Sequence, residues 1–132
     1  MTTALYAGIL AILFIVLSFR VIAKRNQYKV AIGSNGQALL ERAIRVHANF
    51  AEYVPFALLL MFLAEYSGLA PVYLHILGVA LIVGRLSHAF GVSQQHEPLK
   101  FRVFGMMLSM LVMLAAAVAS IVLYALRAGW LL

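Results

Sequence analysis

Four long apolar runs, separated by short polar segments, dominate this chain of 132 residues. A helix needs about 20 mostly apolar residues to cross a bilayer. The runs that approach or exceed this length are residues 3–19, 37–66, 72–90 and 101–126, and the first helix is expected to continue to about residue 28. We therefore predict an all-α integral membrane protein, a four-helix transmembrane bundle, in which residues 1–132 form a single domain.

The composition supports a membrane protein and argues against several other classes. Hydrophobic residues make up 65% of the chain and charged residues 11%, whereas a soluble domain is about 45–50% apolar and about 25% charged. The net charge of +6 comes mostly from basic residues beside the apolar runs, where they meet membrane lipids rather than nucleic acid. No cysteine is present, and the four histidines show no metal-ligand spacing, so we expect no metal site.

The basic residues also predict how the helices are oriented. Lys24, Arg25 and Lys29 belong to the segment between the first two runs, and Lys100 and Arg102 follow the segment between the third and fourth. The opposite side has one arginine, near the carboxyl end. By the positive-inside rule, loops one and three are expected to be cytoplasmic and both termini to lie across the membrane.

Polar side chains interrupt the second apolar run along one face. Arg45, Asn49 and Glu52 are spaced at i, i+4 and i+7, so an α-helix aligns them in what we call the polar stripe. Each ionisable group at bilayer depth costs about 2.5–3.5 kcal/mol on insertion scales, and such groups usually serve a function. Arginine offers a planar fork to a carboxylate, asparagine both donates and accepts, and ionised glutamate accepts from an ammonium group.

The polar stripe predicts a binding site for a zwitterionic or peptide-like ligand. The alternative is an Arg45–Glu52 pair that only fixes the second helix to its neighbours. Such a pair would need neither Asn49 nor the additional charged residues Glu41 and Arg42. The ligand site is therefore the preferred interpretation, and the structural pair remains open.

Three more residues are candidates, each with a simpler structural explanation. Arg85 and His88 lie at i, i+3 near one end of the third run. Arg85 could bind a ligand, pair with Glu52 or extend to the lipid headgroups, and His88 is weak evidence by itself. Arg102 could be a membrane anchor, or a cation that lowers the pKa of a thiol on a bound ligand, since a free thiol has a pKa of about 8.5.

These motifs resemble those of the MAPEG superfamily, the membrane-associated proteins in eicosanoid and glutathione metabolism. The third run contains a pattern similar to that family's third-helix motif, Gly84-Arg85-x-x-His88. The second run contains a more specific pattern, similar to the second-helix signature, Glu41-Arg42-x-x-Arg45-x-x-x-Asn49-x-x-Glu52-Tyr53-x-Pro55. The size and the four-span layout resemble the small bacterial branch of the family.

The resemblance implies a homotrimer in the bacterial inner membrane, with glutathione held between subunits and open to the cytoplasm. It implies that a helix-one arginine and a helix-four arginine, here Arg25 and Arg102, contact glutathione, with Arg102 stabilising its thiolate. Arg85 and His88 would belong to the pocket from the third helix. The remaining contacts to the carboxylates, backbone and amino group would come from Arg45, Asn49, Glu52 and Tyr53.

The resemblance predicts a glutathione-dependent transferase that adds the thiolate to lipophilic electrophiles, with peroxidase activity as a related possibility. One departure is that His88 and Val92 stand where family enzymes often have an aromatic hydroxyl. This departure is compatible with an alternative, a non-enzymatic lipid-binding or scaffold member. A small multidrug transporter fits less well, because the first helix has no acid and Glu52 lies beside Arg45, which keeps it ionised.

Overall fold

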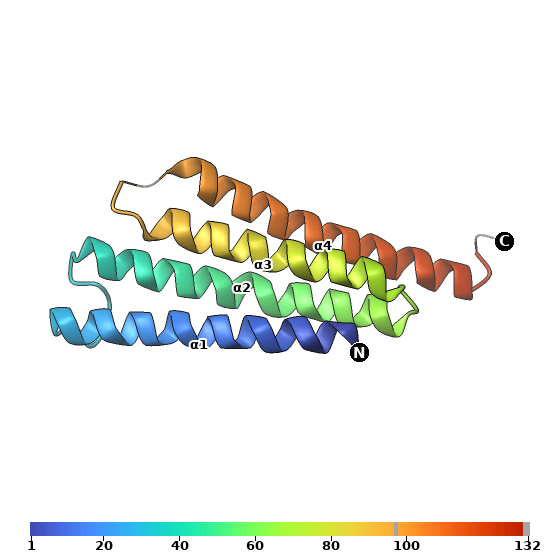
Figure 1. Ribbon diagram of the computed structural model, residues 1–132, viewed down its shortest axis with the longest axis horizontal. Helices are drawn as coiled ribbons and strands as arrows, with labels where there is room; N and C mark the ends of the chain where they lie inside the picture. Colours follow the sequence, from blue (N-terminus) through green and yellow to red (C-terminus); the bar gives the residue numbers. More distant parts are fainter. Residues whose placement is uncertain (97, 131–132) are drawn as a thin grey trace.

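The computed structural model describes residues 1–96 and 98–130 (Figure 1). Within these residues there are four helices and no β-strand: α1 (Thr2–Tyr28), α2 (Ala38–Tyr66), α3 (Pro71–Ser93) and α4 (Leu99–Arg127). The predicted all-α fold is confirmed. Each of these helices is long and apolar enough to cross a membrane, so the chain is an integral membrane protein with a four-span bundle.

The helices run up and down along one direction, so the loops divide between two ends of the bundle (Figure 1). The α1–α2 and α3–α4 connections lie at one end. The N-terminus, the α2–α3 turn and the carboxyl end of α4 lie at the other. Among the described residues α2 and α3 each contact all three other helices, whereas α1 and α4 do not meet. The second and third helices therefore form the centre of the bundle, and α1 and α4 pack against them.

The end of α3 differs from the predicted boundary. Hydropathy ends the third span at residue 90, but the helix continues to Ser93. Val92 is buried in this last turn, and its carbonyl oxygen accepts a hydrogen bond from Arg42 of α2 at 3.1 Å. A tertiary contact thus stabilises a turn of helix that the apolar pattern alone does not show.

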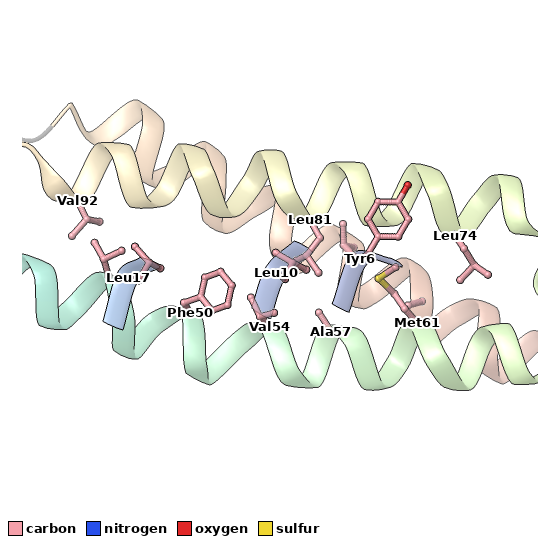
Figure 2. Packing of buried hydrophobic residues seen from close by; sticks show 13 residues of the cluster. Tyr6, Leu10, Leu17, Phe50, Val54, Ala57, Met61, Leu74, Leu81 and Val92 are labelled. Atoms are coloured by element: carbon pink, nitrogen blue, oxygen red, sulfur yellow. The ribbon is translucent and has the colours of Figure 1, made fainter. Parts of the chain in front are cut away.

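The apolar core runs along the centre of the bundle, where side chains of α1, α2 and α3 meet (Figure 2). Leu10, Ala57, Met61, Leu74 and Leu81 are each at most 1% exposed. Large apolar side chains also cover the outer surface of all four helices. This distribution is expected where the outer faces meet lipid hydrocarbon instead of water.

Glycines bring the backbones of α3 and α4 into direct contact. A Cβ added at Gly105 would lie 2.4 Å from the carbonyl oxygen of Gly84 and 2.5 Å from the amide nitrogen of His88. A Cβ added at Gly91 would lie 2.7 Å from the amide nitrogen of Arg102. Small residues at such crossings are typical of helix packing in membranes. These contacts fix where His88 and Arg102 stand at one end of the bundle.

We expect Gly105→Ala to lower stability, because the new methyl group must push the α3 backbone away. Overpacking of this kind typically costs about 1–3 kcal/mol, which would appear as a lower melting temperature of the purified protein in detergent. Gly8→Ala is the matched control, since a Cβ there meets no atom within 4 Å and alanine is the better helix former. An unchanged melting temperature for Gly105→Ala would contradict the packing described above.

Candidate functional site

A cavity of about 320 Å³ opens among α2, α3 and α4, at the end of the bundle that carries the α1–α2 and α3–α4 loops. Most of its wall comes from α2, while α3 and α4 close the opposite side. It is lined by Ala38, Glu41, Arg42, Arg45, Asn49, His88, Val92 and Arg102. The structure therefore brings together four residues that the sequence predicts for the site, namely Arg45, Asn49, His88 and Arg102.

The helical repeat of α2 places polar side chains on the cavity wall. Arg42, Arg45 and Asn49 are spaced at i, i+3 and i+7, which keeps them on adjacent positions of one face. The hydrogen bond from Arg42 to the Val92 carbonyl joins this face to the last turn of α3. Arg102 completes the cavity because the glycine contacts let the first turn of α4 approach α3.

The lining residues that the structure describes carry a net positive charge. They include three arginines and one glutamate, and arginine stays protonated at any ordinary pH. The described residues provide no group of three or more His, Asp or Glu side chains that could hold a metal ion. The chemistry of this wall therefore suits an organic anion, or a zwitterion with an excess of carboxylate groups.

Behind the cavity wall lies a buried arginine. Arg85 is only 1% exposed, and its guanidinium donates to Asn49 Oδ1 at 2.6 Å and to Ser109 Oγ at 3.4 Å. It also approaches His88 Nδ1 at 3.5 Å, and the ring of Phe50 lies 5.7 Å from its Cζ. Arg85 thus does not reach the headgroups, one of the roles that the sequence leaves open.

The Arg85 contacts determine which groups face a ligand. A guanidinium can only donate, so the atom of Asn49 that it contacts must be the carbonyl oxygen. The amide nitrogen of Asn49 is then left to donate toward the cavity. His88 Nδ1 likewise faces a guanidinium group that can only donate. Arg85 therefore orients Asn49 as a hydrogen-bond donor toward a cavity ligand.

Glu52 and Tyr53 lie about one turn deeper along α2 and do not line this cavity. Glu52 is exposed on the outer surface of the chain, while Tyr53 is half-buried and interacts electrostatically with Arg85. No ion pair joins Glu52 to Arg45 or Arg85 among the residues that the structure describes. The structure of one chain therefore does not support the alternative in which an ion pair between Arg45 and Glu52 only fixes α2 to its neighbours.

Arg25 lies apart from the cavity, in the last turn of α1. Its Nη1 donates to the carbonyl oxygens of Ala31 at 3.1 Å and Gly33 at 2.9 Å, and more weakly to that of Val30. Lys29 ends the helix in the left-handed conformation with φ 55°. Within one chain, Arg25 thus orders the α1–α2 loop and does not reach the predicted site.

We expect Arg25→Gln to destabilise the α1–α2 loop without weakening ligand binding in the cavity. Hydrogen bonds that involve a charged group contribute about 1.5–3 kcal/mol, so hydrogen exchange of the loop amides after α1 should accelerate. The dissociation constant of glutathione should stay that of the wild type. A large rise in that constant would instead indicate that Arg25 contacts the ligand, for example from a neighbouring subunit.

The sequence alone did not assign three of the side chains that shape the site. Arg42 lines the cavity, and the same helical period that aligned Arg45 with Asn49 could have identified it. Ser109 and Met106 of α4 contact the Arg85 guanidinium at 3.4 and 3.9 Å. Nothing in the apolar fourth run links these two residues to Arg85, because only the packing of α3 on α4 brings them close.

Comparison with known proteins identifies the family. The sequence profile of the MAPEG family matches residues 3–122. The Inner membrane protein YecN of Escherichia coli strain K12 is 42% identical over 106 residues, which cover 80% of this chain and 79% of that protein. The protein of the same name from an O6:H1 strain of Escherichia coli shows the same identity and coverage. Both the matched length and the identity exceed chance similarity by far, and the chain belongs to the MAPEG family.

Proposed function

We propose that this protein is a glutathione-dependent transferase of the bacterial inner membrane that acts on lipophilic electrophiles. The observation that carries the proposal is the convergence of Arg45, Asn49 and Arg102 on one positively charged cavity. Family membership supports a link to glutathione metabolism, and the name of the two relatives supports the inner membrane as the location. We also propose that loops one and three face the cytoplasm, where glutathione would enter.

The charges of the cavity wall match those of glutathione. This tripeptide has two carboxylates, one ammonium group and one thiol. Arg42 and Arg45 can each bind a carboxylate through a charge-assisted hydrogen bond, and Glu41 can accept from the ammonium group. Asn49, held by Arg85, can donate to a peptide carbonyl of the ligand. A cavity of about 320 Å³ falls at the lower end of the usual size for small-molecule sites.

The exposed part of the polar stripe supports association with another subunit. Arg45 and Glu52 are exposed on the surface of the single chain within a membrane-spanning helix. Leaving both charges against hydrocarbon would be costly. We propose that a neighbouring subunit covers them, so that glutathione lies between subunits in a homotrimer. In that arrangement Glu52 and Tyr53 would form the inner end of a site that one chain leaves open.

Arg102 would activate the thiol. Arg102 lines the cavity at the start of α4, and a nearby cation favours a thiolate over a thiol. Glutathione supplies the sulfur nucleophile, so the chain needs no nucleophile of its own. The thiol proton leaves to solvent, a sulfur–carbon bond forms, and a group such as halide departs with its bonding electrons. The apolar outer faces of the helices allow the electrophile to arrive from the bilayer.

A second candidate is a lipid-binding or scaffold protein without turnover. The observation that favours it is the pair His88 and Val92, which stand where family enzymes often have an aromatic hydroxyl. Val92 has no hydrogen-bonding side chain, and His88 is held by Arg85. Under this alternative the protein would bind hydrophobic molecules but would form no glutathione conjugate.

Turnover distinguishes the two candidates. The purified full-length protein in lipid nanodiscs should conjugate glutathione to an aryl halide at a rate proportional to protein concentration. Arg45→Ala should lower the rate about 10- to 100-fold at subsaturating glutathione, the effect of losing about 1.5–3 kcal/mol of charged hydrogen bonding. Arg127→Ala removes an equal charge at the opposite end of the bundle and should have no effect. If no conjugate forms with a panel of electrophiles, the transferase proposal fails and the scaffold candidate is favoured.

A further inference from the structure

A groove of about 430 Å³ lies between α3 and α4, at the end of the bundle that carries the α3–α4 loop (Figure 1). Its residues on α3 recur at i, i+3, i+4 and i+7, the spacing of one helical face, and its residues on α4 at i and i+3. They are Val83, Leu86, Ser87, Phe90, Phe101 and Phe104. We call this feature the α3–α4 groove. Its five apolar side chains are each at least 38% exposed, so they face outward from the single chain.

The groove runs from the loop end of the bundle toward the middle of the membrane. Between Phe90 and Val83, α3 covers about 10 Å at about 1.5 Å per residue. Ser87 is the polar residue among those that line the groove, and its Oγ already donates to the Phe101 carbonyl oxygen at 2.9 Å. The inner part of the groove therefore suits a hydrocarbon chain.

A lysine stands at the outer end of the groove. Lys100 is exposed in the first turn of α4, and its Nζ lies 5.4 Å from the centre of the Phe101 ring. That ring packs edge-on against Phe90, with centroids 5.2 Å apart, and both rings line the groove. The ring pair and the Ser87 hydrogen bond thus hold the start of α4 on α3, with the ammonium group beside the mouth of the groove.

The positions of the groove and the lysine define the kind of molecule that fits both. The first turn of a membrane-spanning helix lies where hydrocarbon meets the lipid headgroups, and a lysine there attracts anionic lipids. An occupant must therefore be apolar where it meets Val83 and Leu86, and negatively charged where it meets Lys100. A phospholipid with a net negative headgroup combines these two properties at the required depth.

We propose that the α3–α4 groove is a binding site for an anionic phospholipid. One acyl chain lies along Val83, Leu86 and Phe104, and the phosphate pairs with Lys100. A zwitterionic phospholipid fills the same groove, but its own ammonium group offsets the attraction to Lys100, so it binds more weakly. This inference is independent of the proposed glutathione chemistry, since the groove and the α2–α3–α4 cavity share no lining residue.

Paired photoreactive lipids test the proposal. Phosphatidylglycerol and phosphatidylcholine, each with the same diazirine-bearing acyl chain, are added in small amounts to nanodiscs of phosphatidylcholine that contain the full-length protein. Crosslinks are then mapped by mass spectrometry. Phosphatidylglycerol should label the residues of the α3–α4 groove about fivefold more than phosphatidylcholine, the effect expected for one lysine beside an anionic lipid. At about 1 M salt, where the Debye length is about 3 Å, the ratio should fall toward one.

Three variants assign the preference to Lys100. In Lys100→Ala the ratio should fall to about one, while both lipids still label the groove. Lys100→Arg keeps the positive charge and should keep the ratio. Lys24→Ala is the matched control, because the Lys24 Nζ lies 5.8 Å from the centre of the Tyr28 ring but neither residue lines the groove. This control should keep the wild-type ratio, and unchanged melting temperatures show that the bundle is intact in each variant.

Four results would overturn the proposal. Equal labelling by the two lipids in the wild type means that the groove does not select an anionic headgroup. A preference that survives Lys100→Ala assigns the selectivity to another group. Equal losses in Lys24→Ala and Lys100→Ala mean that only the overall charge of this end matters. Absence of crosslinks in the groove, with labelling elsewhere on the bundle, means that another subunit covers it.

Discussion

Arg102→Ala should lower the rate of glutathione conjugation about 30-fold at pH 7, because a thiol with its ordinary pKa of about 8.5 is only about 3% ionised there. The dissociation constant of glutathione should rise in the same direction, because a site that lowers the pKa of the bound thiol also binds the thiolate more tightly. Arg102 lines the cavity from the first turn of α4, where it would meet the thiol and not the carboxylates. The measurement combines initial rates with calorimetric binding constants on the same preparations.

The rate deficit of Arg102→Ala should shrink as the pH rises. Under the proposed mechanism the guanidinium lowers the pKa of the bound thiol in the wild type, so the thiolate should persist at neutral pH. In the variant the thiol returns toward its ordinary pKa of about 8.5, and ionisation is complete only above that pH. Wild-type and variant rates should therefore converge above about pH 9. A ratio that stays constant with pH would mean that Arg102 acts on something other than the thiol proton.

Lys100→Ala is the matched control for Arg102→Ala. Lys100 is two residues away, carries the same charge and lies 5.4 Å from the centre of the Phe101 ring, but it does not line the cavity. Its removal should leave the rate unchanged, and Arg102→Lys should recover part of the lost rate. Equal losses in Lys100→Ala and Arg102→Ala would show that general surface charge matters, and not the position of Arg102.

Arg85→Met should weaken glutathione binding about 10- to 100-fold without unfolding the bundle. The long apolar side chain of methionine fills the buried space, and removing the guanidinium also removes the free-energy cost of burying a cation. The variant loses the donor that orients Asn49 and the positive charge behind the cavity wall. A loss of about 1.5–3 kcal/mol of binding free energy corresponds to this rise of about 10- to 100-fold in the dissociation constant of glutathione.

Melting temperatures separate the binding effect of Arg85→Met from a folding defect. Asn49→Ala, which leaves Arg85 in place, should weaken binding in the same direction, because the cavity loses the amide donor that Arg85 orients. Arg85→Lys keeps the charge but not the planar fork, so its dissociation constant for glutathione should lie between those of the wild type and Arg85→Met. If Arg85→Met binds glutathione like the wild type, Arg85 is a packing residue only.

The fold could be predicted from the sequence because membranes impose strong constraints. Every backbone polar group must be paired within a span, so a long apolar run can only be a helix. The spacing of Arg45 and Asn49 likewise predicted a shared face, since the helical period determines it. The end of α3 was less predictable, because the contact of Arg42 with the Val92 carbonyl joins residues far apart in the chain.

The roles of individual arginines were harder to predict than their positions. Arg85 could equally have bound a ligand, paired with Glu52 or reached the headgroups, and the choice depended on Asn49 and Ser109 from two other helices. Arg25 had a family precedent as a ligand contact, yet its guanidinium reaches loop carbonyls of its own chain. Side-chain reach and loop conformation decide such cases, and neither is encoded in residue spacing.

Calorimetric titration of the detergent-solubilised protein with glutathione tests the central claim most directly. We predict saturable heat with a single class of sites in the wild type. In Arg45→Ala the dissociation constant should be at least about 10-fold higher, whereas Arg127→Ala should match the wild type. No saturable heat in the wild type, or equal affinities for the wild type and Arg45→Ala, would contradict the assignment of the α2–α3–α4 cavity as a glutathione site.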